Sequence, residues 1–172
     1  MSLKEEIDKL IEAERKGLEV ADQRALEHRE RQRQHFAPLA ALLAEIKASV
    51  EPKYLDAVVY EDRAIVKVGR PFHGLFEVAL RWEIAPYNFG APLERCVSHE
   101  RPGFRITPER PGFCVEETRW YNFEHAVFES QHVFADAAAV AEYLIAEIAK
   151  EVALYEHQEA IVRGPGGSRS QP

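Results

Sequence analysis

The spacing of apolar residues changes twice along the chain, and these changes divide it into three parts. In the first fifty residues, apolar side chains recur every three or four positions among charged ones, which predicts helix. From Tyr54 to Phe134 the chain becomes aromatic and β-branched with proline and glycine between, which predicts strands joined by turns. Helical spacing returns from Ala135. This order of helix, sheet and helix predicts an α+β fold.

The first helical segment carries a narrow apolar stripe that fades into a wholly polar stretch at residues 27–35. The stripe consists of Leu3, Ile7, Leu10, Ile11 and Leu18. A stripe of this kind either folds back onto the chain's own sheet or pairs with another chain. We predict that residues 1–36 form a charged helical arm through which the chain self-associates, most simply as a dimer.

Proline interrupts the helical pattern at Pro38. Because proline lacks a backbone N–H and is tolerated in a first turn, we predict a break or kink near His35–Pro38 and a fresh helix beyond it. The apolar stripe of that second helix predicts that it belongs to the core. Its members are Leu39, Leu42, Leu43, Ile46 and Val50.

The last helical segment begins after Asp136, a residue type that commonly caps helix N-termini. We predict a helix to about His157 with a broad apolar face that covers the sheet. The chain would then divide into the arm, an α+β domain at residues 37–162, and a flexible tail at 163–172, where glycine, proline and serine dominate.

The central part of the chain shows the alternation of an antiparallel sheet with one buried face. The best strand runs from Leu75 to Ile84, and residues 57–60 and 64–68 look like a hairpin. In the best strand, one face is apolar, with Phe76, Val78, Leu80, Trp82 and Ile84. Shorter strands are predicted at 95–98, 104–107, 113–119 and 124–128. We expect a twisted antiparallel sheet of about five to seven strands, covered by helices on one face.

Two Arg-Trp pairs precede the same aromatic tripeptide, at Tyr87–Phe89 and Tyr121–Phe123. Aromatic residues at strand ends usually pack against the core. The alternative is a rim that lines a pocket or a partner groove, because arginine and aromatic residues concentrate binding energy. That rim would consist of Arg81, Trp82, Tyr87, Arg119, Trp120 and Tyr121. It requires the two strand ends to lie at the same edge of the sheet.

No recognised catalytic, phosphate-binding or metal-binding motif occurs in the sequence. The seven histidines lack ligand spacing, and neither a phosphate-binding glycine loop nor a Gly-x-Ser-x-Gly turn is present. We therefore predict no catalytic residue, no metal and no cofactor. Cys96 and Cys114 are expected to be reduced thiols, with a cross-strand disulfide as the lesser alternative.

Charge and composition narrow the classes of partner. The 172 residues carry a formal charge of -7, which disfavours nucleic acid and anionic membranes. No apolar run is long enough to span a bilayer, and no secretory signal opens the chain, so we expect a cytoplasmic protein. The acidic residues of the last helix are expected to face solvent, or alternatively to dock a basic partner. They are Glu142, Glu147, Glu151 and Glu156.

These features favour a non-enzymatic protein-interaction module that self-associates through its N-terminal helix and binds an unknown protein partner. The alternative is a small-molecule-binding or enzymatic α+β domain with an Arg- and aromatic-lined pocket beside the sheet. In size, acidity and helix-flanked sheet the chain is similar to small acidic chaperones of protein export. This similarity of composition implies a chaperone-like form of the interaction role.

Overall fold

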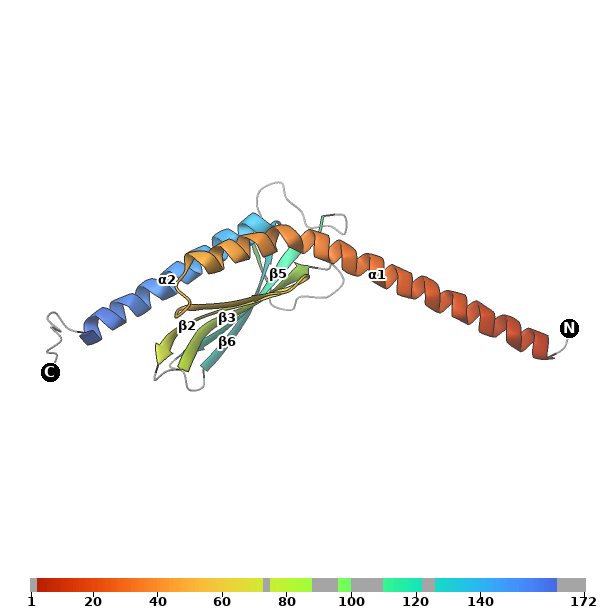
Figure 1. The fold of residues 1–172 in the computed structure, drawn as a ribbon, viewed down its shortest axis with the longest axis horizontal. Coiled ribbons are helices and arrows are strands. Elements are labelled where there is room, and N and C mark those ends of the chain that lie inside the picture. The colour runs from red at the N-terminus through yellow and green to blue at the C-terminus, as the bar shows by residue number, and fades with distance from the viewer. Residues whose placement is uncertain (1–2, 73–74, 88–95, 100–109, 122–125, 164–172) are drawn as a thin grey trace.

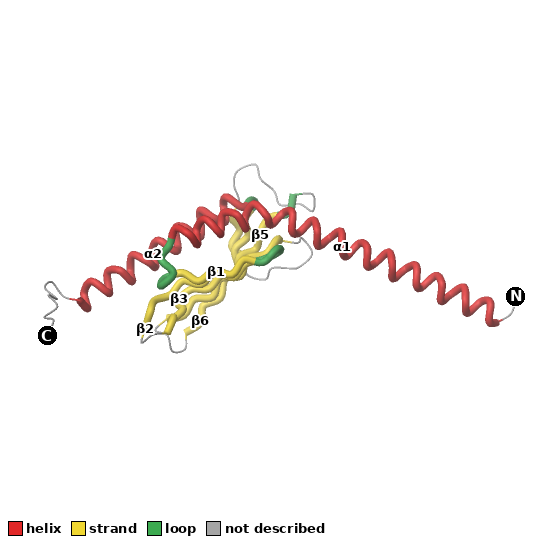
Figure 2. The backbone as a smooth tube through the Cα atoms, in the orientation of Figure 1, coloured by secondary structure: helices red, strands yellow, loops and turns green. Residues whose placement is uncertain are grey.

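A computed structural model describes residues 3–72, 75–87, 96–99, 110–121 and 126–163 of the chain. Two helices lie along one face of a single sheet (Figures 1 and 2). The elements are α1 (Leu3–Ser49), β1 (Leu55–Val59), β2 (Ala64–Phe72), β3 (Leu75–Tyr87), β4 (Cys96–His99), β5 (Gly112–Tyr121), β6 (Ala126–Phe134) and α2 (Ala137–Arg163). The predicted α+β fold, with its antiparallel sheet and long N-terminal helix, is confirmed.

The sheet has the strand order β1-β2-β3-β5-β6-β4 among the described residues. Its neighbours pair antiparallel except at one edge, where the short β4 runs parallel to β6. Because β6 lies between β4 and β5, Cys96 and Cys114 do not face each other across a hairpin. The strand predicted at 104–107 lies outside the described residues.

The core lies between the sheet and the second half of α1 together with α2. From α1 it receives the predicted stripe: Leu39, Leu43 and Ile46 are buried, while Leu42 and Val50 pack at its edge. The helix-covered face of the sheet contributes Val66, Val68, Leu80, Trp82, Ile84, Phe113 and Val115, all at most 1% exposed. The opposite face carries polar residues such as Lys67 and Glu83, so the predicted buried and solvated faces are confirmed.

The predicted fresh helix after Pro38 is wrong, because α1 passes through this residue without interruption. Proline removes one i to i−4 hydrogen bond and crowds the preceding turn, and this kinks a helix. The helix continues past the proline because the buried Phe36 and Leu39 hold it on either side. Figure 1 shows α1 changing direction where it reaches the sheet. The helix is anchored there by His35, whose ring stacks on Phe113 at 4.5 Å and whose Nε2 lies 3.1 Å from the Gly112 carbonyl oxygen.

The predicted alternation of β3 fails in its first residues. The pairing with β2 slips by one residue at Gly69, so the faces exchange. Glu77 therefore lies on the helix-covered face, paired with Arg70 at 2.9 Å. Phe76 and Val78, which we predicted on that face, lie on the other. Gly69 permits the slip, because a Cβ there would stand 2.2 Å from the Glu77 carbonyl oxygen.

The predicted cap of the last helix is confirmed. Asp136 Oδ1 accepts a hydrogen bond of 2.8 Å from the Ala139 backbone N–H, which satisfies one of the donors left open at a helix N-terminus. α2 then continues to Arg163, beyond the end predicted at His157. Its buried face, with Val140, Leu144 and Ile148, closes the core over the sheet.

Candidate functional site

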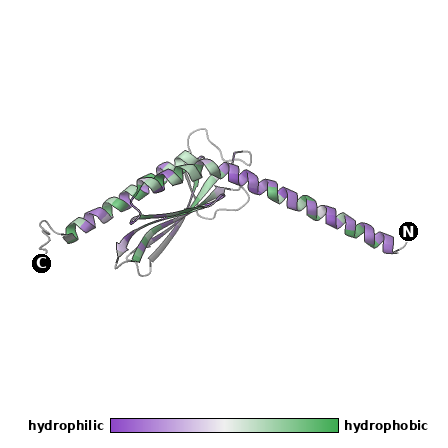
Figure 3. Cartoon of the chain, viewed as in Figure 1, coloured by the Kyte–Doolittle hydropathy of each residue, from purple (hydrophilic) through white to green (hydrophobic). Residues whose placement is uncertain are grey.

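The N-terminal part of α1 projects from the sheet as a continuous helix (Figure 1). Every residue from 4 to 31 is exposed, and we call this segment the arm. At 1.5 Å per residue it is about 42 Å long. Along the arm, hydrophilic residues predominate, with hydrophobic positions scattered among them (Figure 3). The arm therefore offers a long surface that the described part of the chain leaves uncovered.

The predicted stripe on the arm is exposed: Ile7 by 48%, Leu10 by 63%, Ile11 by 47% and Leu18 by 65%. The side chain of Leu3 lies outside the described residues. Leu18 precedes the buried Phe36 by 18 residues, which is five helical turns, and Ile7 precedes the buried Leu43 by 36 residues, which is ten. The apolar stripe of the arm is thus in line with the side of α1 that packs into the core.

The six predicted rim residues are divided between the two faces of the sheet. Trp82 is fully buried on the helix-covered face, opposite Glu117 of β5, and Arg119 shares that face. Arg81 lies on the other face, where it pairs with Glu83. Because successive strand residues point to opposite faces, Trp120 does not share the face of Arg119. These arginine and tryptophan side chains therefore do not form one surface.

The two aromatic strand ends also lie at opposite ends of the paired strands β3 and β5. The register of β3 and β5 places Tyr87 opposite Gly112, which is the first residue of β5, whereas Tyr121 is its last. The side chain of Tyr121 lies outside the described residues. The condition that we set for a shared rim is therefore not met.

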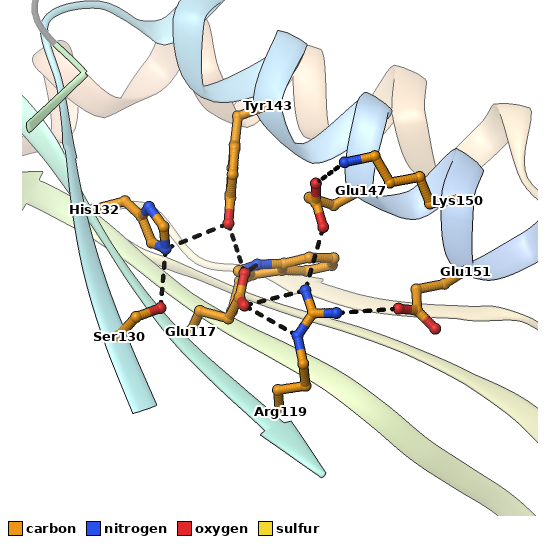
Figure 4. A network of polar contacts seen from close by, with 9 residues as sticks. Glu117, Arg119, Ser130, His132, Tyr143, Glu147, Lys150 and Glu151 are labelled. Atoms are coloured by element: carbon orange, nitrogen blue, oxygen red, sulfur yellow. Dashed lines mark hydrogen bonds and ion pairs between the residues drawn. The ribbon is translucent and has the colours of Figure 1, made fainter. Parts of the chain in front are cut away.

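The structure instead brings together a polar network around Glu117, which is only 5% exposed (Figure 4). Its Oε2 accepts hydrogen bonds from Trp82 Nε1 at 2.9 Å and from the Tyr143 hydroxyl at 2.6 Å. Its Oε1 accepts from the Arg119 guanidinium, with the nearer nitrogen at 3.3 Å. Oε2 thus has donors from β3 and α2, and Oε1 has donors from β5. Both oxygens of the buried carboxylate are satisfied, as a buried charge requires.

Arg119 extends the network to α2 through Glu147 at 3.2 Å and Glu151 at 3.4 Å. Lys150 also pairs with Glu147. Two of the four acidic residues that we expected to face solvent are therefore turned toward the sheet, whereas Glu142 and Glu156 are exposed. Ion pairs between Arg119 of β5 and the two glutamates of α2 therefore hold α2 against β5.

On its other side the network reaches Ser130 and His132 of β6. His132 Nε2 lies 2.9 Å from Ser130 Oγ and 3.4 Å from the Tyr143 hydroxyl oxygen. We predicted no role for these residues from the sequence, because the contact joins elements that are far apart in the chain. One local signal is present in the sequence: Glu117 and Arg119 follow Phe113 and Val115 at alternate positions, so they share the inward face of β5, where apolar residues are usual.

The pKa values of Glu117 and Tyr143 are both shifted further from neutral pH. Burial works against the charge of Glu117, but hydrogen bonds from Tyr143 and Trp82 and the nearby Arg119 outweigh it and lower the pKa of the carboxyl group. Burial, reinforced by Glu117, raises the pKa of Tyr143. A general acid or base works best with a pKa near the working pH, so this pair is suited to holding structure rather than to transferring protons.

Besides the arm, the surface has a groove of about 640 Å³ between the core-packed half of α1 and α2. Its lining is mainly apolar and includes Leu42, Ile46, Val50, Ile145, Ala149 and Val152. The exposed carboxylates of Glu45 and Glu156 stand among its lining residues. The groove thus combines an apolar floor with negative charge.

The described residues show neither a metal site nor a membrane-spanning helix. Within the described ranges, no group of three or more His, Cys, Asp or Glu side chains is placed to hold a metal ion. None of the helices in the same ranges has the length and apolar character needed to cross a bilayer. Comparisons of the chain with protein-family models, curated proteins and solved structures found no significant match.

Proposed function

We propose that this chain is a non-enzymatic protein-interaction module that dimerises through its arm and binds a protein partner at the groove between α1 and α2. The observation that carries the proposal is the exposed apolar stripe in line with the core-facing side of α1. A helix in water gains little stability without tertiary contacts on its apolar side. Covering the stripe with a second copy would supply those contacts.

The size of this effect follows from the exposed fractions. Complete burial of a leucine side chain contributes about 2 kcal/mol, so burying the exposed 63% of Leu10 would contribute about 1.3 kcal/mol. A symmetric dimer buries this leucine twice, which gives about 2.5 kcal/mol. Loss of that contribution corresponds to a roughly fiftyfold weaker dimer.

The test compares Leu10→Ala with Leu26→Ala in the full-length chain by sedimentation equilibrium. Both leucines are 63% exposed on the arm, but at about 100° per residue they lie roughly 160° apart around the helix. We expect Leu10→Ala to raise the dimer dissociation constant roughly fiftyfold. Leu26→Ala should leave it nearly unchanged. Equal weakening by both changes, or a wild-type chain that never dimerises, would contradict the proposed role of the stripe.

For the groove we propose a partner segment that forms a helix with one apolar face and basic flanks. The apolar lining would cover its apolar face, and Glu45 and Glu156 would attract its positive charges. Fluorescence anisotropy with a labelled Leu/Lys amphipathic peptide tests this, with a Leu/Glu peptide as the comparison. Ala149→Trp, which fills the groove, should abolish binding, whereas Ala146→Trp on the same helix outside the groove should not. Equal binding by both variants would place the peptide elsewhere.

A further inference from the structure

Charge is distributed unevenly along the arm. The tip, residues 4–14, has five acidic and two basic side chains, for a net charge of 2 − 5 = −3. The base, residues 23–33, consists of the last residues of the arm and the two that follow it, and has four basic and two acidic side chains, for a net charge of 4 − 2 = +2. The intervening residues 15–22 carry two of each sign and are balanced. The two ends of the arm therefore have opposite charge.

Few of the basic side chains of the base form ion pairs with other described residues. Its acidic residues accept hydrogen bonds from neutral glutamines: Glu27 from Gln23 at 3.2 Å, and Glu30 from Gln34 at 3.0 Å. Arg33 pairs with Glu61 of the β1–β2 turn. In the described part of the chain, Arg24, Arg29 and Arg31 pair with no carboxylate, and Arg31 Nε donates only to the Glu27 backbone carbonyl oxygen at 3.4 Å. Three arginine side chains on an exposed surface therefore have no carboxylate partner among the described residues.

We infer that two copies of the chain pair their arms antiparallel, so that the tip of each arm lies along the base of the other. This inference rests on the proposed self-association and specifies its orientation. A parallel pair would place tip against tip and base against base, with like charges facing at both ends. An antiparallel pair places −3 against +2 at both ends.

The geometry of the arm suits this arrangement. The tip and the base each span 11 residues, with the balanced segment between them, so a two-fold axis would pass near Leu18. Leu18 is 65% exposed and belongs to the stripe, so the two copies of it would meet at the axis. Figure 1 shows the arm standing clear of the sheet, which leaves its length accessible to a second helix.

The test uses three charge-reversed full-length chains. The tip-reversed chain carries Glu5→Lys, Glu6→Lys and Asp8→Lys. The base-reversed chain carries Arg24→Glu, Arg29→Glu and Arg31→Glu. The doubly reversed chain carries all six changes. In an antiparallel dimer each single-segment reversal creates repulsion at both ends and should raise the dissociation constant at least about tenfold, whereas the doubly reversed chain should recover wild-type affinity.

Orientation is read most directly from a mixture of the wild-type chain and the isotope-labelled doubly reversed chain by native mass spectrometry. Antiparallel pairing predicts that the two chains sort into homodimers, because a mixed dimer would place tip against base with like charge. Parallel pairing predicts an excess of the mixed dimer. Far-UV circular dichroism and thermal unfolding of each variant verify that the fold is retained, since all six side chains are exposed.

The outcomes separate this inference from the proposed function. A wild-type chain that stays monomeric would overturn both. If Leu10→Ala weakens the dimer but charge reversal does not, self-association through the stripe is supported. Antiparallel pairing of the arms is then contradicted. An excess of mixed dimers would overturn it in the same way. Self-sorting together with recovery in the doubly reversed chain would support it.

Discussion

Replacing Glu117 with glutamine would remove the charge at the centre of the polar network while keeping the shape of the side chain. The carboxylate accepts hydrogen bonds from Trp82 and Tyr143 and pairs with Arg119. An amide presents one acceptor oxygen, and its NH₂ group would face donors. With the amide oxygen in the place of Oε2, the Trp82 and Tyr143 donors keep only a neutral acceptor, and the NH₂ group faces the Arg119 guanidinium. The hydrogen bonds from Arg119 to a charged acceptor are then lost, at about 1.5–3 kcal/mol, and Arg119 keeps only its partners on α2. We expect Glu117→Gln to lower the free energy of unfolding by about 3 kcal/mol.

Urea unfolding followed by tryptophan fluorescence measures this change, since Trp82 lies in the core. The matched control is Glu116→Gln, which alters the adjacent residue of β5 on the opposite, exposed face. Its effect should stay within about 0.5 kcal/mol. If Glu117→Gln also changes stability by less than about 1 kcal/mol, the network does not stabilise the packing of α2 on the sheet.

The same variant has a predicted pH dependence. Because folding lowers the pKa of Glu117, its stabilising effect is complete above the pKa of the unfolded chain, about 4.3, and is lost as the pH falls through the lower pKa of the folded state. The stability difference between wild type and Glu117→Gln should therefore be constant from pH 7 to about 5 and shrink below about pH 4. A difference that grows as the pH falls would contradict the assigned charge state.

Three further substitutions test individual contacts. Gly69→Ala should destabilise the chain by about 1–3 kcal/mol in urea unfolding, because its Cβ would meet the Glu77 carbonyl, and a neutral effect would contradict the close approach. Gly17→Ala, where nothing lies within 4 Å, should instead stabilise the arm by about 0.5–1 kcal/mol and raise the helical circular dichroism signal. Asp136→Ala should cost about 1 kcal/mol through the lost cap of α2, whereas Asp136→Asn should recover most of it.

The sequence predicted elements whose apolar spacing is regular and whose ends carry a local signal. The Asp136 cap and the core stripe of α1 are examples, because their partners lie within a few residues or on one helix face. The slip of β3 against Gly69 depends on how closely two backbones approach, and the parallel edge strand β4 depends on which strand it reaches. Neither of these can be inferred from spacing. The continuity of α1 through Pro38 likewise depends on packing that holds both sides of the kink.

The candidate sites show the same division. The stripe of the arm could be recognised from the sequence, since it is a property of one helix. The network of Glu117 could not, because Trp82, Tyr143 and His132 come from three other elements. The only local sign of this network in the sequence is the pair of charged residues, Glu117 and Arg119, at inward positions of β5. Conversely, the repeated tripeptides suggested a shared rim. The antiparallel register of β3 and β5 instead places the starts of the two tripeptides, Tyr87 and Tyr121, at opposite ends of the paired strands.

The most direct test of the central claim is native mass spectrometry of the full-length, wild-type chain at micromolar concentration. Self-association through the arm predicts a species of 2 × 19.6 kDa, or about 39 kDa, that dissociates on dilution and in the Leu10→Ala variant. A species of 19.6 kDa at every concentration would contradict the claim. The exposed stripe would then have no role in pairing two copies of the chain.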